Sequence, residues 1–134
     1  MSEKKPGAGL EDVVAGESSI CFIDGLKGIL RYRGYPAQDL ATKCSFEETL
    51  YLLWNGELPN KTQLAELRAQ LESYAAPPAE AIAVMRTLPK DIHPMAAIRT
   101  AMSVAGHYAP DAEKSAKDPA AGRRSAARLQ AWIV

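Results

Sequence analysis

The sequence predicts a mainly α protein in which an N-terminal β-hairpin is followed by a helical array. Two short apolar runs flank a glycine-containing turn within residues 18–33, which is the pattern of a hairpin. Over residues 36–108, apolar side chains instead recur every third or fourth position between capping residues and prolines, which is typical of successive helices. The length of 134 residues fits one compact body.

The hairpin of residues 18–33 turns at a segment that contains Gly25 and Gly28. We expect both glycines to adopt positive φ, as short hairpin loops require. Gly34 is expected to end the second strand, and Pro36 to lie in the first turn of a short helix.

The next two predicted helices begin at residues that can cap a helix. Ser45 and Glu48 form a capping box, which predicts a helix over residues 45–56. Asn60 can cap a helix over residues 61–74. The apolar stripes of these helices are Phe46, Leu50, Leu53 and Trp54 in the first, and Leu64, Leu67, Leu71 and Tyr74 in the second.

Prolines punctuate the remainder of the helical part. Pro77-Pro78 is expected to start a helix that Pro89 ends, and Pro94 to start another over residues 94–107. Residues 109–123 are rich in Ala, Asp, Lys, Pro and Gly and are expected to form a solvated linker. The inner faces of the two helices are expected to hold Ile82, Met85 and Leu88, and Met95, Ile98, Met102 and Ala105.

The last segment, residues 124–134, is expected to be a truncated helix. Its apolar stripe holds Ala126, Leu129, Trp132 and Ile133, and the sequence stops at Val134 without a capping residue, Gly or Pro. We therefore expect the chain to be part of a longer protein.

Composition excludes several classes of partner. The 16 basic and 16 acidic residues cancel, so the charge pattern of a nucleic-acid-binding or lipid-binding protein is absent. Neither a secretory signal nor a membrane-spanning apolar run is present, and we expect a cytoplasmic protein in which Cys21 and Cys44 stay reduced. Because many of its hydrophobic residues are alanines, the core is expected to depend on a modest set of larger side chains.

Side chains that could perform chemistry are few. His93 and His107 lack partners at metal-ligand spacing, and His93, just before Pro94, is better explained as a helix cap. Arg31 and Arg33 alternate along a strand and are expected on its solvated face. We therefore assign no catalytic, cofactor-binding or metal-ligating residue to this chain.

Several short blocks of residues, in a fixed order along the chain, resemble those of a known protein family. This resemblance is independent of the hydrophobic periodicity that predicts the helices. The sequence resembles bacterial and archaeal members of the citrate synthase family, which use citrate-forming or 2-methylcitrate-forming condensations. The resemblance covers residues 9–106 and rests on Gly9-Leu10-Glu11-Asp12-Val13-Val14-Ala15, Glu17-Ser18-Ser19-Ile20, Phe22-Ile23-Asp24-Gly25, Gly28-Ile29-Leu30-Arg31-Tyr32-Arg33-Gly34-Tyr35, Ser45-Phe46-Glu47-Glu48, Leu52-Leu53, Gly56-Glu57-Leu58-Pro59, His93-Pro94-Met95 and Arg99-Thr100-Ala101.

The resemblance implies that the chain is the N-terminal part of the large domain of a homodimeric or higher-order enzyme. That enzyme condenses acetyl-CoA, or propionyl-CoA in the methylcitrate branch, with oxaloacetate and releases CoA without a metal or a separate cofactor. In the family, the aspartate, histidines and arginines that perform this chemistry lie beyond the point where this sequence stops. His93-Pro94-Met95 also resembles a block near a regulatory nucleotide site of some hexameric members. The alternative is a non-catalytic helical remnant that acts only as an interaction module.

Overall fold

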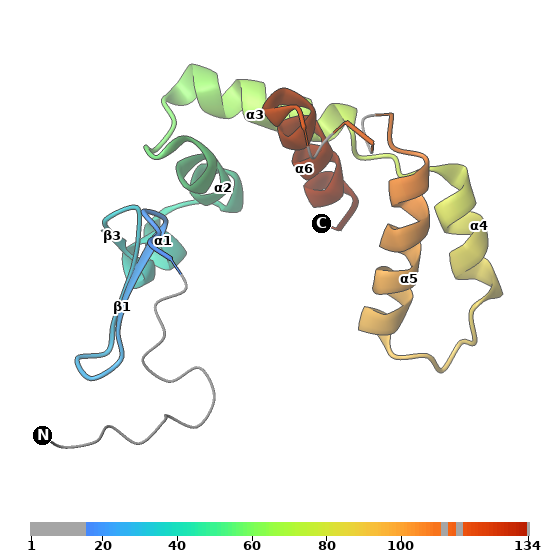
Figure 1. Cartoon of the computed structure of the whole chain (residues 1–134), viewed down its shortest axis with the longest axis horizontal. Coiled ribbons are helices and arrows are strands. Elements are labelled where there is room, and N and C mark those ends of the chain that lie inside the picture. Colours follow the sequence, from blue (N-terminus) through green and yellow to red (C-terminus); the bar gives the residue numbers. More distant parts are fainter. Residues whose placement is uncertain (1–15, 111–112, 115–116, 134) are drawn as a thin grey trace, which may run out of the picture. The chain divides into compact units, whose positions relative to one another are not determined.

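The structure is a computed structural model that describes residues 16–110, 113–114 and 117–133 (Figure 1). The first block of the resemblance, residues 9–15, and Val134 lie outside the described residues. The chain divides into two compact units, Met1–Pro59 and Asn60–Val134, instead of the single body that its length predicts.

The described part of the first unit, residues 16–59, combines a small sheet with two helices. The sheet is antiparallel, has three strands in the order β1-β2-β3, and packs against α1 through β2 and β3. The elements are β1 (Cys21–Asp24), β2 (Ile29–Tyr32), β3 (Tyr35–Pro36), α1 (Ala37–Lys43) and α2 (Phe46–Asn55). Among the described residues of this unit, the buried side chains are Leu40, Leu50 and Leu52.

The turn between β1 and β2 differs in detail from the prediction. Gly28 has the expected positive φ, 64°, but Gly25 does not adopt one. The Asp24 side chain explains the difference, because its carboxylate accepts a hydrogen bond from the backbone N–H of Lys27 at 3.1 Å and organises the turn from within. Only the last residue of the turn therefore needs the left-handed conformation.

The prediction that the sheet would be a single hairpin is wrong, because β3 adds a third strand. Arg33 and Gly34 have φ of 48° and 89°, which turns the chain tightly back from β2 into β3. Pro36 pairs with Arg31 across the sheet and precedes α1 as its N-cap, so Pro36 lies just outside the helix and not in its first turn.

The caps predicted for α2 are confirmed. Ser45 Oγ accepts from the Glu48 N–H at 3.3 Å, and the Glu48 carboxylate accepts from the Ser45 N–H at 2.6 Å. Gly56, with a φ of 90°, ends the helix. The buried face is shifted from the predicted stripe, because Leu52 is fully buried while Phe46 remains 50% exposed.

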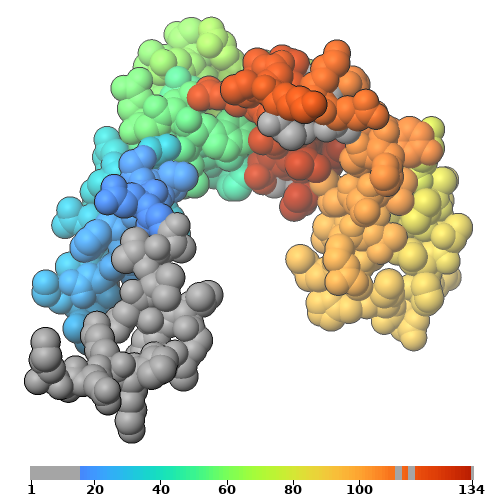
Figure 2. Space-filling model, in the orientation of Figure 1, coloured from blue at the N-terminus to red at the C-terminus, as the bar shows by residue number. Residues whose placement is uncertain are grey.

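The second unit is formed by helices alone among its described residues. They are α3 (Lys61–Ser73), α4 (Ala79–Thr87), α5 (Pro94–His107) and α6 (Pro119–Ile133). Helices α4 and α5 lie side by side, as Figures 1 and 2 show, and α6 packs against α3 and α5. Asn60 caps α3 through a capping box with Gln63, so the helix predicted at this position is confirmed.

Alanines, and not the larger side chains, supply most of the buried positions of the second unit. Leu67 is the one large buried side chain among its described residues, whereas Met85 and Met95 are 40% and 65% exposed. The inner faces predicted for α4 and α5 are therefore only partly buried. Small side chains let helix backbones approach closely, which explains why the buried residues are Ala81, Ala101, Ala105, Ala121 and Ala127.

The linker predicted for residues 109–123 is shorter in the structure, and the prediction that the last helix begins at residue 124 is wrong. Helix α6 begins at Pro119. The Asp118 carboxylate accepts from the Ala120 N–H at 2.9 Å, and its carbonyl accepts from the Gly122 N–H at 2.9 Å. Asp118-Pro119 is thus a cap followed by proline, a helix-start signal that the loop-like composition around it concealed.

Candidate functional site

The two histidines occupy helix termini. His93 is the N-cap of α5, and its Nδ1 accepts a hydrogen bond from the Met95 N–H at 3.2 Å, which confirms the predicted cap. His107 is the last residue of α5 and is exposed. The cap assigns a structural role to His93, and His107 stands apart from it at the opposite end of the same helix.

Arginines are the side chains best suited to bind a carboxylate, and three of them occupy different settings. Arg31 lies on β2 and is exposed, as predicted, and Arg99 is exposed on α5. Arg33 is not on a solvated face, which corrects the prediction. It is half-buried, and its guanidinium donates to Ser19 Oγ at 2.8 Å and to the Leu53 carbonyl at 3.0 Å.

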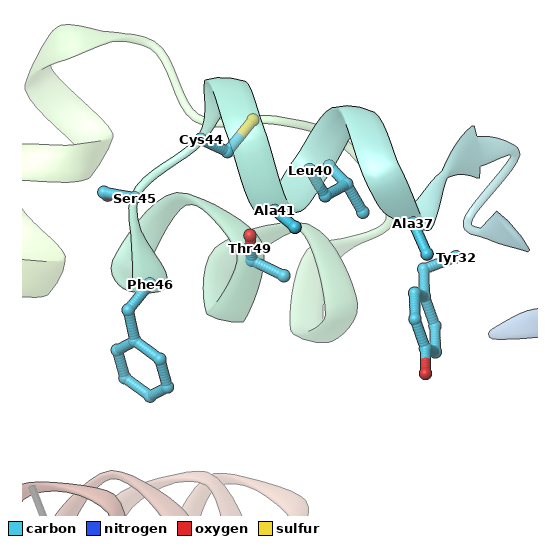
Figure 3. A pocket seen from close by; sticks show the side chains of 8 residues that line it. All are labelled: Tyr32, Ala37, Leu40, Ala41, Cys44, Ser45, Phe46 and Thr49. Carbon is cyan, nitrogen blue, oxygen red and sulfur yellow. The ribbon is translucent and has the colours of Figure 1, made fainter.

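The first unit has a shallow pocket between α1 and α2, with a volume of about 350 Å³. Figure 3 shows the rings of Tyr32 and Phe46 at its two ends, projecting in the same direction from the sheet and from α2. Its lining residues are Tyr32, Ala37, Leu40, Ala41, Cys44, Ser45, Phe46 and Thr49. This lining contains no charged side chain, so the pocket lacks the cations that a dicarboxylate ligand needs.

A second shallow pocket, of about 440 Å³, lies between β2 and α1. It brings together Arg31 and Gln38 with the backbone around Gly28. A single exposed guanidinium can meet one carboxylate, but the other lining residues of this pocket supply no acid, base or nucleophile. Neither of these two pockets is therefore equipped for catalysis.

Electrostatics in the described part of the chain are mild. Lys43 donates a hydrogen bond to Asp39 at 2.8 Å, and this bond and the carboxylate charge raise the pKa of Lys43. Among the described residues, no three His, Cys, Asp or Glu side chains gather as metal ligands. No helix of the described residues is long and apolar enough to cross a membrane.

Comparison with known proteins decides the family. A family model described as "Citrate synthase, C-terminal domain" matches residues 9–134. The chain belongs to the citrate synthase family. The match confirms the family resemblance. The structure confirms the mainly helical fold, in which the predicted N-terminal hairpin is extended by a third strand.

The relatives within the citrate synthase family include both citrate synthases and 2-methylcitrate synthases. The chain is 46% identical over 126 residues to citrate synthase 2 of Bacillus subtilis, covering 93% of this chain and 33% of the relative. It is 40% identical over 111 residues to 2-methylcitrate synthase 1 of Corynebacterium glutamicum, covering 83% of this chain and 29% of the relative. The chain thus spans about a third of the length of these curated relatives.

A solved citrate synthase shares the fold. The enzyme of the archaeon Thermoplasma acidophilum, in a ternary complex with carboxymethyl coenzyme A and oxaloacetate, superposes with a TM-score of 0.77. The sequences are 27% identical, and the match covers 90% of this chain and 31% of that one. The fold of the chain is therefore that of a citrate synthase segment.

Proposed function

We propose that the complete protein condenses acetyl-CoA with oxaloacetate and water to give citrate and CoA, as an acyltransferase at the entry to the tricarboxylic acid cycle. The observation that carries this proposal is the family match over residues 9–134. The 46% identity to a citrate synthase over nearly the whole chain supports the acetyl-CoA substrate.

The present chain is proposed to be the N-terminal part of the large domain of that enzyme. It contributes scaffold and no catalytic residue, because His93 caps a helix and neither of the two pockets described above offers a set of acid, base and carboxylate-binding groups. The complete enzyme is proposed to be cytoplasmic and to act without a metal or a separate cofactor, binding only its two substrates.

Exposed apolar surface supports a homodimer or higher homo-oligomer of the complete enzyme. Phe22 and Ile23 on β1 are 57% and 67% exposed, and Leu26 at the hairpin turn is fully exposed. Such a concentration of apolar side chains on one short hairpin favours burial against further protein.

A second candidate is 2-methylcitrate synthase, which uses propionyl-CoA, because the 2-methylcitrate synthase of C. glutamicum is 40% identical to this chain. The test uses the polypeptide encoded by the reading frame continued past Val134. CoA release is followed with oxaloacetate and either acyl-CoA, and the ratio of the two kcat/KM values is measured. A ratio favouring acetyl-CoA supports the first proposal, and a ratio favouring propionyl-CoA supports the second.

The third candidate is a non-catalytic remnant that acts as an interaction module. Sequencing the DNA beyond codon Val134 separates it from both enzymes. A frame that continues with histidine and aspartate blocks supports the enzyme, whereas an immediate stop codon supports the remnant.

A further inference from the structure

The backbone of Arg33 is unusual for its residue type. Its φ of 48° lies in the left-handed region, and with Gly34 at 89° it forms the two central positions of the turn from β2 to β3. Turns with positive φ at both positions favour Asn, Asp or Gly at the first of them, because Gly lacks the Cβ atom that strains the backbone there and the short polar side chains of Asn and Asp offset the strain through local hydrogen bonds. The turn itself therefore gives no reason for an arginine.

The side chain of Arg33 supplies the reason. Its guanidinium reaches Ser19 Oγ, before β1, at 2.8 Å and the Leu53 carbonyl, on α2, at 3.0 Å. Its backbone N–H donates to the Ile20 carbonyl at 2.8 Å, which continues the pairing of β1 with β2. One residue thus joins the start of the sheet, the second turn and a helix twenty positions away.

Helix α2 lacks a cation of its own where Arg33 meets it. Its first turn carries Glu47 and Glu48, but its last turn has no basic residue. The Gly56 N–H donates a hydrogen bond to the Leu52 carbonyl at 2.8 Å. The neighbouring Leu53 carbonyl accepts a hydrogen bond from the Arg33 guanidinium. A cation at a helix C-terminus also complements the helix dipole.

The guanidinium is partly buried as well as bonded. Arg33 Nε is buried and has no hydrogen-bond partner among the described residues. Loss of water from a charged group is unfavourable, so the site is maintained by the two bonds that the guanidinium does make.

We propose that Arg33 is a clamp that caps α2 from a distant part of the chain and thereby holds the sheet of the first unit against the end of that helix. The clamp accounts for the left-handed arginine, for the missing basic residue at the end of α2, and for the contact with Ser19. It acts within the first unit, so α4 and α5 are independent of it.

Hydrogen exchange followed by mass spectrometry on the 134-residue chain tests the clamp. Arg33→Asn suits the backbone turn but removes the guanidinium, and Arg31→Asn, on the exposed neighbour, is the matched control. We expect Arg33→Asn to accelerate exchange about tenfold or more in both β1–β2 and the last turn of α2, since bonds to charged groups are among the stronger ones. Exchange in α4 and α5 should not change.

Ser19→Ala removes one bond of the clamp and leaves the turn intact, so a smaller acceleration confined to the first unit is expected. The proposal is overturned if Arg33→Asn exchanges like Arg31→Asn, or if the parent chain shows no protection in these two segments. Loss of protection in α4 and α5 as well would also overturn it, because the effect would then not be local.

Discussion

Ser45 stabilises α2 through its side chain, which accepts a hydrogen bond from the Glu48 N–H. This N–H lies in the first turn, where no carbonyl of the helix itself is available to it. Replacing Ser45 with Ala removes the acceptor for the Glu48 N–H and disrupts the reciprocal bond of the capping box. The expected loss is about 1 kcal/mol of unfolding free energy. Urea unfolding followed by circular dichroism measures it, and Ser45→Asp, which retains an acceptor, should lose less.

Leu52 and Leu53 are adjacent residues with different burial. Leu52 has no exposed surface, whereas Leu53 is only half-buried. We expect Leu52→Ala to cost roughly 2–5 kcal/mol through lost burial and the cavity left behind, and Leu53→Ala to cost clearly less. The same urea experiment distinguishes them, and an equal cost for both variants would show that the buried face of α2 is wrongly assigned.

Alanines decide packing at the scale of the element, and α4 offers a matched pair. Ala81 is 2% exposed, whereas Ala83, on the same helix, is exposed. Leucine forms helices almost as readily as alanine, so propensity changes little in either variant. We expect Ala81→Leu to destabilise the chain by about 1–3 kcal/mol through overpacking, and Ala83→Leu to have little effect in thermal unfolding.

Elements with local signals could be predicted from the sequence, and those governed by distant contacts could not. Three of the helices begin at a local signal that acts within one turn, namely Ser45, Asn60 and Pro94. These helices therefore lie where the sequence predicts them. The buried alanines depend on which helix lies opposite, and the strand β3 depends on an arginine forced into positive φ. No periodic pattern contains that information.

The candidate site follows the same division. The capping role of His93 could be predicted because the bond spans only two residues. The role of Arg33 could not, because it depends on a carbonyl twenty positions away, although an arginine directly before a turn glycine was an available signal. Catalytic groups could not be predicted here at all, and the chain spans only about a third of its relatives.

At the scale of the molecule, the described residues include large apolar side chains that are exposed. Several large side chains of the hairpin and of the helix ends are exposed, among them Phe22, Leu26, Phe46 and Ile133. We expect the isolated 134-residue chain to associate in solution. Size-exclusion chromatography with light scattering measures this, and a stable, monodisperse monomer would be the contrary result.

We propose that this segment is part of a citrate synthase and contains none of its catalytic residues. An activity assay of the isolated chain tests this proposal. The measurement is CoA release from acetyl-CoA and oxaloacetate by the purified 134-residue chain, with the continued polypeptide assayed beside it. We expect turnover by the continued polypeptide and none above the uncatalysed rate by the chain alone. Turnover by the isolated chain, or none by either protein, would contradict it.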